Sequence, residues 1–212
     1  MGGGAGNQSI PLARSGYRVT IVDSSAAMLV RAEELLAAEP AEVRARVSLV
    51  EADGVDAPEL LGRQRFDGVL CHGVVMYLDD PEPMVRALAA LARPGGVVSV
   101  VAKNARTLAV RPALAGDWTQ ALASFDATRQ VNGLDVDTRA DTVEDMSGLM
   151  EEYGVEPIAW YGVRLFTDAW SEERAADDLD ESMLAVELEA SRRDPYRQLS
   201  RLFHLLGARG RS

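Results

Sequence analysis

The sequence of 212 residues is very poor in cysteine, histidine and lysine, with Cys71, His72, His204 and Lys103 as the full set. A single cysteine cannot form an internal disulfide, so a reducing cytoplasm is the expected location. One cysteine and two distant histidines do not make a metal site. No apolar run approaches the ~20 residues that a membrane span needs, so no membrane partner is expected.

The charge of the chain is acidic overall, with a formal net charge of −11 at pH 7, which argues against a nucleic-acid partner. The distribution is uneven: residues 141–190 carry 15 acidic side chains against Arg164 and Arg174, whereas residues 191–212 carry six arginines against Asp194. Two interpretations remain open. The end of the chain is either a solvated acidic face followed by a basic tail, or a basic tail that contacts RNA phosphates.

From Gly16 onward, strand-like and helix-like segments alternate, which predicts an α/β domain with a mostly parallel, Rossmann-like sheet. The segments expected to form strands are 17–22, 47–50, 66–72, 97–102, 155–166 and 202–206. Helices are expected over 24–39, from Asp80 to Pro94, from Asp141 to Gly154, and over 172–193. We expect a single domain over 1–212, with an insertion at 103–140, where little periodicity is present.

The helix starts carry recognisable capping residues. Ser24 is the expected cap of the first helix, and Asp80 the cap of the next one, with Pro81 in its first turn. Asp141 is expected to open a third helix, with Glu144 as its partner in a capping box.

A glycine-rich loop opens the sequence, with Gly2, Gly4 and Gly6 in a G-x-G-x-G spacing. Glycines allow a backbone to pass close to a ligand where any Cβ would collide. Asp23 lies 21 residues after Gly2, at the end of the next strand. In nucleotide-binding α/β folds an acidic residue at this place accepts hydrogen bonds from the ribose hydroxyls. Asp23 can also cap a helix, and the two roles are not exclusive.

The spacing of the glycines distinguishes between cofactors. A dinucleotide site requires G-x-G-x-x-G, and here Asn7 or Ser9 occupies the third glycine position. The pattern therefore favours an S-adenosylmethionine enzyme over a nucleotide-dependent oxidoreductase, which we keep as an alternative.

Two further candidates follow strands at the edge where ligands of open α/β sheets bind. Asp53 follows the second strand and is a candidate for contact with the adenine amino group, or it is an ordinary exposed loop acid. His72 ends the third strand, and three roles compete for it: a cofactor contact, a general base, and a hydrogen-bonded structural histidine. His204 lies in an apolar run and is expected to be structural.

Together these features resemble the class I S-adenosylmethionine-dependent methyltransferases. The resemblance rests on the glycine loop, Val22-Asp23-Ser24, Ala52-Asp53, the strand FDGVLCHGVVMYL and the turn at 93–96. A narrower similarity, to the CmoM/SmtA-type tRNA methyltransferases, extends through CHGVVMYLDDP, Lys103-Asn104, the segment 161–166 and the tail 194–204. Those enzymes methylate the carboxylate of carboxymethoxyuridine at the tRNA wobble position.

The resemblance implies S-adenosylmethionine as the cofactor. It implies that Gly2 and Gly3 lie in the cofactor loop, and that Asp23 binds the ribose. It also implies that Asp53 and Gly54 lie beside the adenine and His72 near the cofactor. For substrate contact the candidate is Arg164, because a guanidinium suits a carboxylate or phosphate; a structural ion pair is the alternative. No catalytic residue is identified.

Two departures from this family pattern affect the prediction. Family members have a strand and helices before the glycine loop, whereas this chain begins at the loop, so the sheet is expected to lack its first, central strand. In the insertion at 103–140 no lysine run is present where the tRNA-type enzymes have one. The expected substrate is therefore a small molecule or a tRNA, and the alternative to an active enzyme is an inactive remnant.

Overall fold

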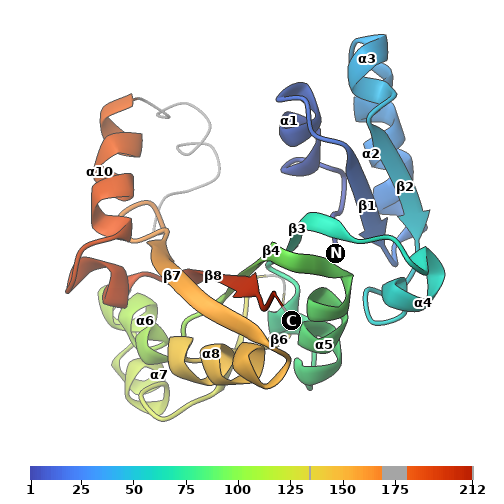
Figure 1. Ribbon diagram of the computed structural model, residues 1–212. Helices are drawn as coiled ribbons and strands as arrows, with labels where there is room; N and C mark the ends of the chain where they lie inside the picture. The colour runs from blue at the N-terminus through green and yellow to red at the C-terminus, as the bar shows by residue number, and fades with distance from the viewer. Residues whose placement is uncertain (134, 169–180, 212) are drawn as a thin grey trace.

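The computed structural model describes residues 1–133, 135–168 and 181–211, and its architecture is α/β as predicted (Figure 1). In the first half lie α1 (Ser9–Arg14), β1 (Val19–Asp23), α2 (Ala26–Ala37), α3 (Ala41–Arg44), β2 (Val47–Glu51), α4 (Ala57–Leu61), β3 (Phe66–His72), α5 (Glu82–Leu91) and β4 (Ala92–Lys103). The second half contains α6 (Val110–Leu114), α7 (Trp118–Ala123), β5 (Arg129–Val131), β6 (Asp137–Arg139), α8 (Val143–Glu152), β7 (Val155–Val163), α10 (Glu181–Ser191) and β8 (Leu202–Arg209).

The main strands form two sheets. β1 and β2 pair in parallel, and a four-stranded sheet has the order β3-β4-β8-β7. Within the larger sheet β3 and β4 are parallel, while β8 runs antiparallel to both β4 and β7. All the predicted strands are present, with ends shifted by a few residues.

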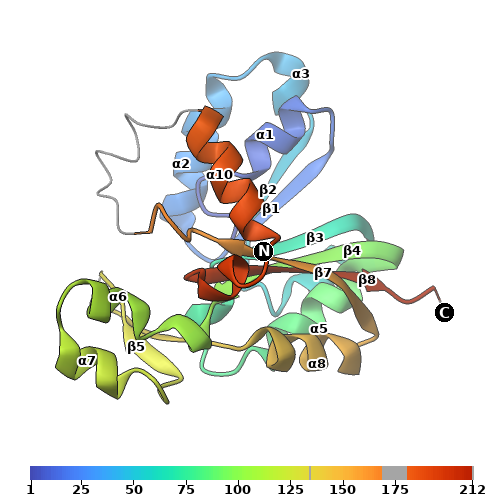
Figure 2. The same ribbon diagram turned by 90° about the vertical axis from the view of Figure 1, so that its left-hand side faces the viewer.

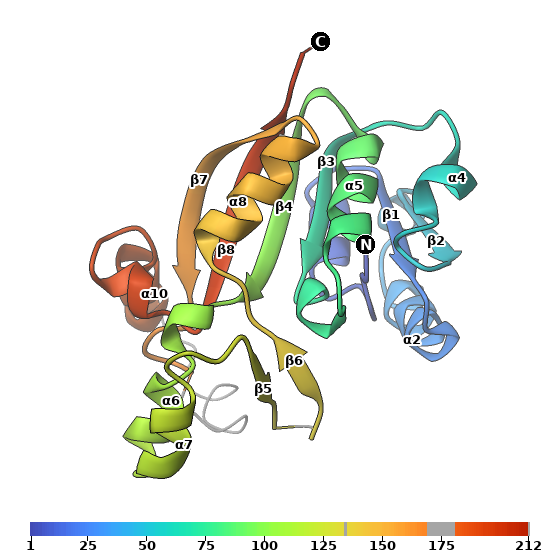
Figure 3. The same ribbon diagram turned by 90° about the horizontal axis from the view of Figure 1, so that it is seen from below.

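The opening residues connect the two sheets. The Met1 amine donates to the carbonyl of Leu70 in β3 at 2.9 Å, and the amide of Gly3 donates to the carbonyl of Val22 in β1 at 3.0 Å. In Figure 3 the start of the chain lies between β1 and β3. In the described part of the chain β1 and β3 do not pair with each other, so the two sheets are separate.

The hydrophobic core lies between α5 and α8 and one face of the four-stranded sheet (Figure 3). Along β8 the side chains alternate, so that Phe203 and Leu205 are buried in this core while His204 points to the other face. Alternate residues of a strand point to opposite faces, which explains this pattern. On that second face lie α1 and α10 (Figure 2). The core also contains Val85, Leu88, Val98, Val100, Met146 and Met150.

All three predicted helix caps lie one residue before the observed cap position. At α5 that position is Pro81 and not Asp80, although the Asp80 carboxylate still accepts from the amide of Glu82 at 2.9 Å. Ser25, and not Ser24, caps α2, because its Oγ accepts from the amide of Met28. The cap of α8 is Thr142, whose Oγ1 accepts from the amide of Asp145 at 3.0 Å.

Asp141 and Glu144, the predicted capping box, have other partners. The Asp141 carboxylate is buried and accepts from the Arg139 guanidinium at 2.5 Å, so it is not free to cap α8. Glu144 pairs with Arg106 at 3.1 Å.

The insertion at 103–140 contains short elements that its sequence did not reveal. Helices α6 and α7 and the β5–β6 hairpin each span three to six residues, too few to produce a clear periodic pattern. They gather at the end of the four-stranded sheet where β3 and β4 end (Figure 3). The predicted helix over 172–193 is confirmed from Glu181 to Ser191, and its first residues lie outside the described part.

We expect Thr142→Ala to lower the free energy of unfolding by about 1 kcal/mol, because the first turn of α8 loses its side-chain cap. Urea unfolding at neutral pH measures this loss. Thr119→Ala is the control, since Thr119 is exposed inside α7 and caps no helix. Equal effects of the two substitutions would contradict the assignment of the cap.

Candidate cofactor site

The glycine loop adopts the conformation that its spacing predicts. Gly2, Gly4 and Gly6 have φ of +61°, +51° and +82°, a region that residues with a Cβ rarely adopt. Gly3 lacks a positive φ, but a Cβ on it would lie 2.7 Å from Cγ2 of Ile21. The loop therefore depends on glycine at four positions, three for conformation and one for close packing against β1.

Asp23 ties the glycine loop to the end of β1. Its Oδ2 accepts from the amide of Gly4 at 2.7 Å, and its Oδ1 accepts from the amide of Ser25 at 2.9 Å. A carboxylate has about four acceptor sites, so both oxygens can accept further hydrogen bonds. Asp23 thus takes part in the turn before α2 and can still receive two hydroxyl donors.

The ends of β1 and β2 are adjacent. The amide of Ala52 donates to the carbonyl of Asp23 at 3.0 Å, which brings the following residue, Asp53, to the same edge. Asp53 is exposed, and its Oδ1 accepts from the amide of Val55 at 2.9 Å. Gly54 is buried, and a Cβ on it would lie 2.7 Å from Cε of Met84. A Cβ at position 54 would force the end of the Met84 side chain in α5 to shift, and Asp53 is the exposed residue of the pair.

Both ring nitrogens of His72 are engaged. Nδ1 lies 2.6 Å from Oε1 of Gln8, and Nε2 lies 2.7 Å from Oγ of Ser99. Burial, the nearby His204 and the Met1 amine together lower the pKa of His72 to about 4. His72 is therefore neutral at physiological pH and has no free ring nitrogen to act as a general base. The sequence did not predict Gln8 or Ser99; a single polar residue inside VVSVVA was the available signal.

We expect the stability of the protein to fall as the pH drops from about 6.5 to about 4. The unfolded state binds a proton at His72 near pH 6.5, whereas the folded state does so only near pH 4. Protons therefore favour the unfolded state throughout this window. The half-buried His204, whose pKa is also lowered by desolvation, adds to the same trend. Urea unfolding at about pH 7 and about pH 4.5 measures the change, which should be smaller in His72→Asn. An equal change in both proteins would contradict the prediction.

Arg164 lies apart from these residues. It follows β7, and the strand order β3-β4-β8-β7 places β7 at the opposite side of the sheet from β3 and His72. Its Nε is 3.9 Å from Oδ1 of Asp168, an oxygen that Arg201 contacts more closely, at 2.7 Å. The side chain is half exposed. Arg164 thus forms the ion pair considered as the alternative, but a loose one that leaves its guanidinium accessible.

Three further arginines near the end of the chain have acidic partners. Arg192 and Arg193 both pair with Glu189, and Arg197 pairs with Asp194 at 2.7 Å. These contacts neutralise part of the basic tail.

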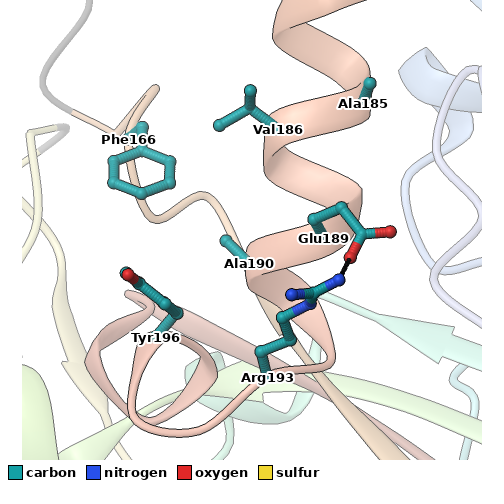
Figure 4. Close-up of a pocket in the computed structure, with 7 residues that line it drawn as sticks. All are labelled: Phe166, Ala185, Val186, Glu189, Ala190, Arg193 and Tyr196. Carbon is teal, nitrogen blue, oxygen red and sulfur yellow. Dashed lines mark ion pairs between the residues drawn. The ribbon is translucent and has the colours of Figure 1, made fainter.

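An apolar hollow of about 400 Å³ lies at α10. In Figure 4, Phe166 and Tyr196 lie on one side of it and the Arg193–Glu189 ion pair on the other. A second hollow of about 230 Å³ is lined by Asn104, Arg106, Val143, Glu144, Trp160, Arg197 and Gln198. Neither hollow is lined by a residue predicted to bind the cofactor.

Among the described residues there is no group of three or more His, Cys, Asp or Glu that could hold a metal. Within the same part of the chain, no helix is long and apolar enough to cross a membrane.

Comparison with known proteins agrees with this geometry. A family described as a methyltransferase domain matches residues 1–98, the region that carries the glycine loop, Asp23, Asp53 and His72. The chain is 30% identical over 211 residues to the tRNA 5-carboxymethoxyuridine methyltransferase of Escherichia coli K12, covering 100% of this chain and 79% of that protein. It therefore belongs to the class I S-adenosylmethionine-dependent methyltransferases.

Other relatives share part of the chain or its fold. The ubiquinone biosynthesis O-methyltransferase of Stutzerimonas stutzeri is 33% identical over 111 residues, 51% of this chain and 46% of that protein. The CcbJ methyltransferase of Streptomyces caelestis superposes with a TM-score of 0.64 at 16% identity, covering 100% of this chain and 82% of that one. The glycopeptide N-methyltransferase MtfA, in complex with S-adenosylmethionine, gives 0.60 at 15% identity, covering 99% and 84%. These structures support the fold.

Proposed function

We propose that the protein transfers a methyl group from S-adenosylmethionine to a carboxylate, and that the acceptor is a carboxymethoxyuridine nucleoside in tRNA. The full-length similarity to the E. coli tRNA 5-carboxymethoxyuridine methyltransferase supports the acceptor. A carboxylate acceptor is favoured because both ring nitrogens of His72 already form hydrogen bonds, so this histidine is not available as a base.

The residues at the ends of β1 and β2 fit the adenosine part of the cofactor. Asp23 has spare acceptor capacity for the two ribose hydroxyls, and its position is fixed by two backbone amides. The outward-facing Asp53 is suited to accept from the adenine amino group. Gly2, Gly3, Gly4 and Gly6 form the backbone wall of the site, and Gly54 lets the chain pass over α5 beside it. His72 helps to hold this loop through Gln8 and does not act as a base.

The chemistry of the acceptor is inferred from His72, the candidate for a general base, whose two ring nitrogens are both engaged. The cofactor supplies an electrophilic methyl group on a sulfonium, and transfer neutralises charge. The enzyme therefore contributes mainly alignment and exclusion of water. A hydroxyl or amine acceptor must lose a proton, whereas a carboxylate is already ionised at neutral pH. His72, neutral and bonded at both nitrogens, is consistent with an acceptor that needs no base.

Arg164 is the candidate for substrate binding. Its half-exposed guanidinium follows β7, and its Nε is only loosely paired with Asp168. A guanidinium can bind a carboxylate through two parallel hydrogen bonds.

A small carboxylic acid is the second candidate for the acceptor. Fewer cations are left to bind RNA phosphates, because acidic residues pair with Arg192, Arg193 and Arg197. The net charge of −11 also disfavours binding of RNA.

Methyl transfer from labelled S-adenosylmethionine tests both candidates. The acceptors are tRNA that carries carboxymethoxyuridine, the free nucleoside, and a panel of small carboxylic acids, with the same tRNA lacking the carboxymethoxy group as control. We expect an alkali-labile methyl ester on the modified tRNA, and a loss of this activity in Arg164→Gln that Arg164→Lys partly restores. Ester formation on small acids alone would favour the second candidate. Methylation of amines or hydroxyls in place of carboxylates would contradict the proposal.

A further inference from the structure

A continuous chain of hydrogen bonds crosses the sheet face opposite the main core. It runs from Gln8 to His72 at 2.6 Å, from His72 to Ser99 at 2.7 Å, and from Ser99 to His204 at 2.7 Å. These four side chains come from the segment before α1 and from β3, β4 and β8. The two imidazole rings meet edge to face with centroids 5.1 Å apart. This series of hydrogen bonds thus includes both histidines of the protein.

The donors and acceptors of these four side chains give the hydrogen bonds a single direction. The atom of Gln8 that faces His72 is the carbonyl oxygen Oε1, so His72 donates from Nδ1 and its Nε2 is an acceptor. Ser99 must then donate its single hydroxyl hydrogen to Nε2 of His72. The oxygen of Ser99 remains free to accept, and His204 donates to it from Nε2. Each group therefore fixes the hydrogen position of the next.

Ser99 is otherwise out of place in β4. It lies between Val98 and Val100 and is only 5% exposed, and burying an unpaired hydroxyl in an apolar strand is unfavourable. Its position between two imidazoles satisfies the hydroxyl as donor and as acceptor. The hydrogen bonds of Ser99 to the two histidines, and not packing within the strand, therefore account for a serine at this position.

We propose that Ser99 is a positioning residue of the cofactor site, which keeps His72 in the Nδ1–H form so that His72 holds Gln8. This proposal rests on the assignment of the glycine loop to the cofactor. Gln8 lies two residues after Gly6, and the amide of Ile10 donates to the carbonyl of Gly6 at 2.8 Å. Fixing Gln8 therefore fixes the junction between the loop and α1. His204, on a strand that carries none of the cofactor residues, orients Ser99.

The arrangement requires a neutral His72 ring, since a protonated His72 would donate from both nitrogens and reverse the Ser99 hydroxyl. Besides the two histidines, the titratable groups that face these side chains in the described part of the protein are the Met1 amine near His72 and Tyr161, whose ring centroid is 6.3 Å from that of His204. The Met1 amine lowers the pKa of His72, so it disfavours an imidazolium.

Titration with S-adenosylhomocysteine gives the first test. We expect Ser99→Ala and Gln8→Ala each to weaken binding about three- to tenfold, the effect of losing one hydrogen bond, which is partly buried at Ser99 and exposed at Gln8. The double variant should bind no more weakly than the worse single variant, because both substitutions break the same chain. Ser48→Ala, the same change at an exposed position of β2, should leave the affinity unchanged. Unchanged binding in Ser99→Ala, or losses that add in the double variant, would overturn the proposal.

Nitrogen-15 NMR of the two histidines gives the second test, and it does not depend on ligand binding. At neutral pH His72 should carry its hydrogen on Nδ1 and His204 on Nε2, and Ser99→Ala should abolish this pairing of forms. A wild-type protein with His72 protonated on Nε2 alone would overturn the proposal. If the expected forms are present but the wild type does not bind S-adenosylhomocysteine, the hydrogen-bond chain is upheld as a structural unit. The cofactor assignment, and with it the positioning role, is then overturned.

Discussion

Replacing Asp23 with alanine is expected to weaken the binding of S-adenosylhomocysteine by about tenfold or more. The carboxylate is the only acidic side chain among the described residues to contact the glycine loop, through the amide of Gly4. Its removal deletes the acceptors proposed for the ribose hydroxyls and also frees the loop from β1. Hydrogen bonds to a charged group contribute about 1.5–3 kcal/mol, which corresponds to a tenfold or larger loss. Isothermal titration calorimetry measures the affinity directly.

The control for this experiment is Asp67→Ala. Asp67 lies near the start of β3, at the other end of the strand from His72, and its carboxylate is 88% exposed and pairs with Arg93. An exposed ion pair contributes little, so both stability and affinity should change only slightly. If Asp23→Ala and Asp67→Ala bind the ligand equally well, Asp23 does not hold the ribose.

Gly2→Ala is expected to abolish measurable binding of the same ligand and to destabilise the protein. The added Cβ would overlap the Val74 side chain, and the positive φ of +61° is unfavourable for alanine. Left-handed backbone at a residue with a Cβ costs about 1–3 kcal/mol before the overlap is counted. The loop must therefore move away from β3, and the cofactor wall moves with it. Calorimetry and urea unfolding measure the two effects separately.

Gly62→Ala tests backbone strain at a positive φ without a steric overlap of the added Cβ. Gly62 ends α4 with a similar φ of +58°, but a Cβ there meets no atom within 4 Å. It should therefore cost some stability and leave the affinity for S-adenosylhomocysteine unchanged. A loss of affinity as large as that of Gly2→Ala would mean that binding responds to global stability and not to the loop.

The conformation of the glycine loop was predictable from the sequence because its requirement is local. Of the four glycines in this loop, those at positions 2, 4 and 6 have a positive φ, and their G-x-G-x-G spacing can be recognised without knowledge of their neighbours in space. Asp23 and His72 were predictable for a related reason. Each ends a short apolar run, and the ends of parallel strands share one edge of the sheet.

The partners of His72 could not be predicted in the same way. The contact between Ser99 and both histidines depends on the register of β4 with β3 and β8, and 105 residues separate Ser99 from His204. The missed cap at Thr142 has a similar origin, since Asp141 is the better capping residue by composition but is held by Arg139. Sequence patterns indicate local preferences, whereas tertiary contacts determine the partners of His72 and the cap of α8.

The most direct test of the account is a calorimetric titration of the purified, folded protein with S-adenosylhomocysteine, with NADH titrated in parallel. The account predicts micromolar binding of S-adenosylhomocysteine and no heat from NADH, since the G-x-G-x-G loop and Asp23 are assigned to the methyl donor. Folded protein that binds NADH, or that binds neither ligand, would contradict it.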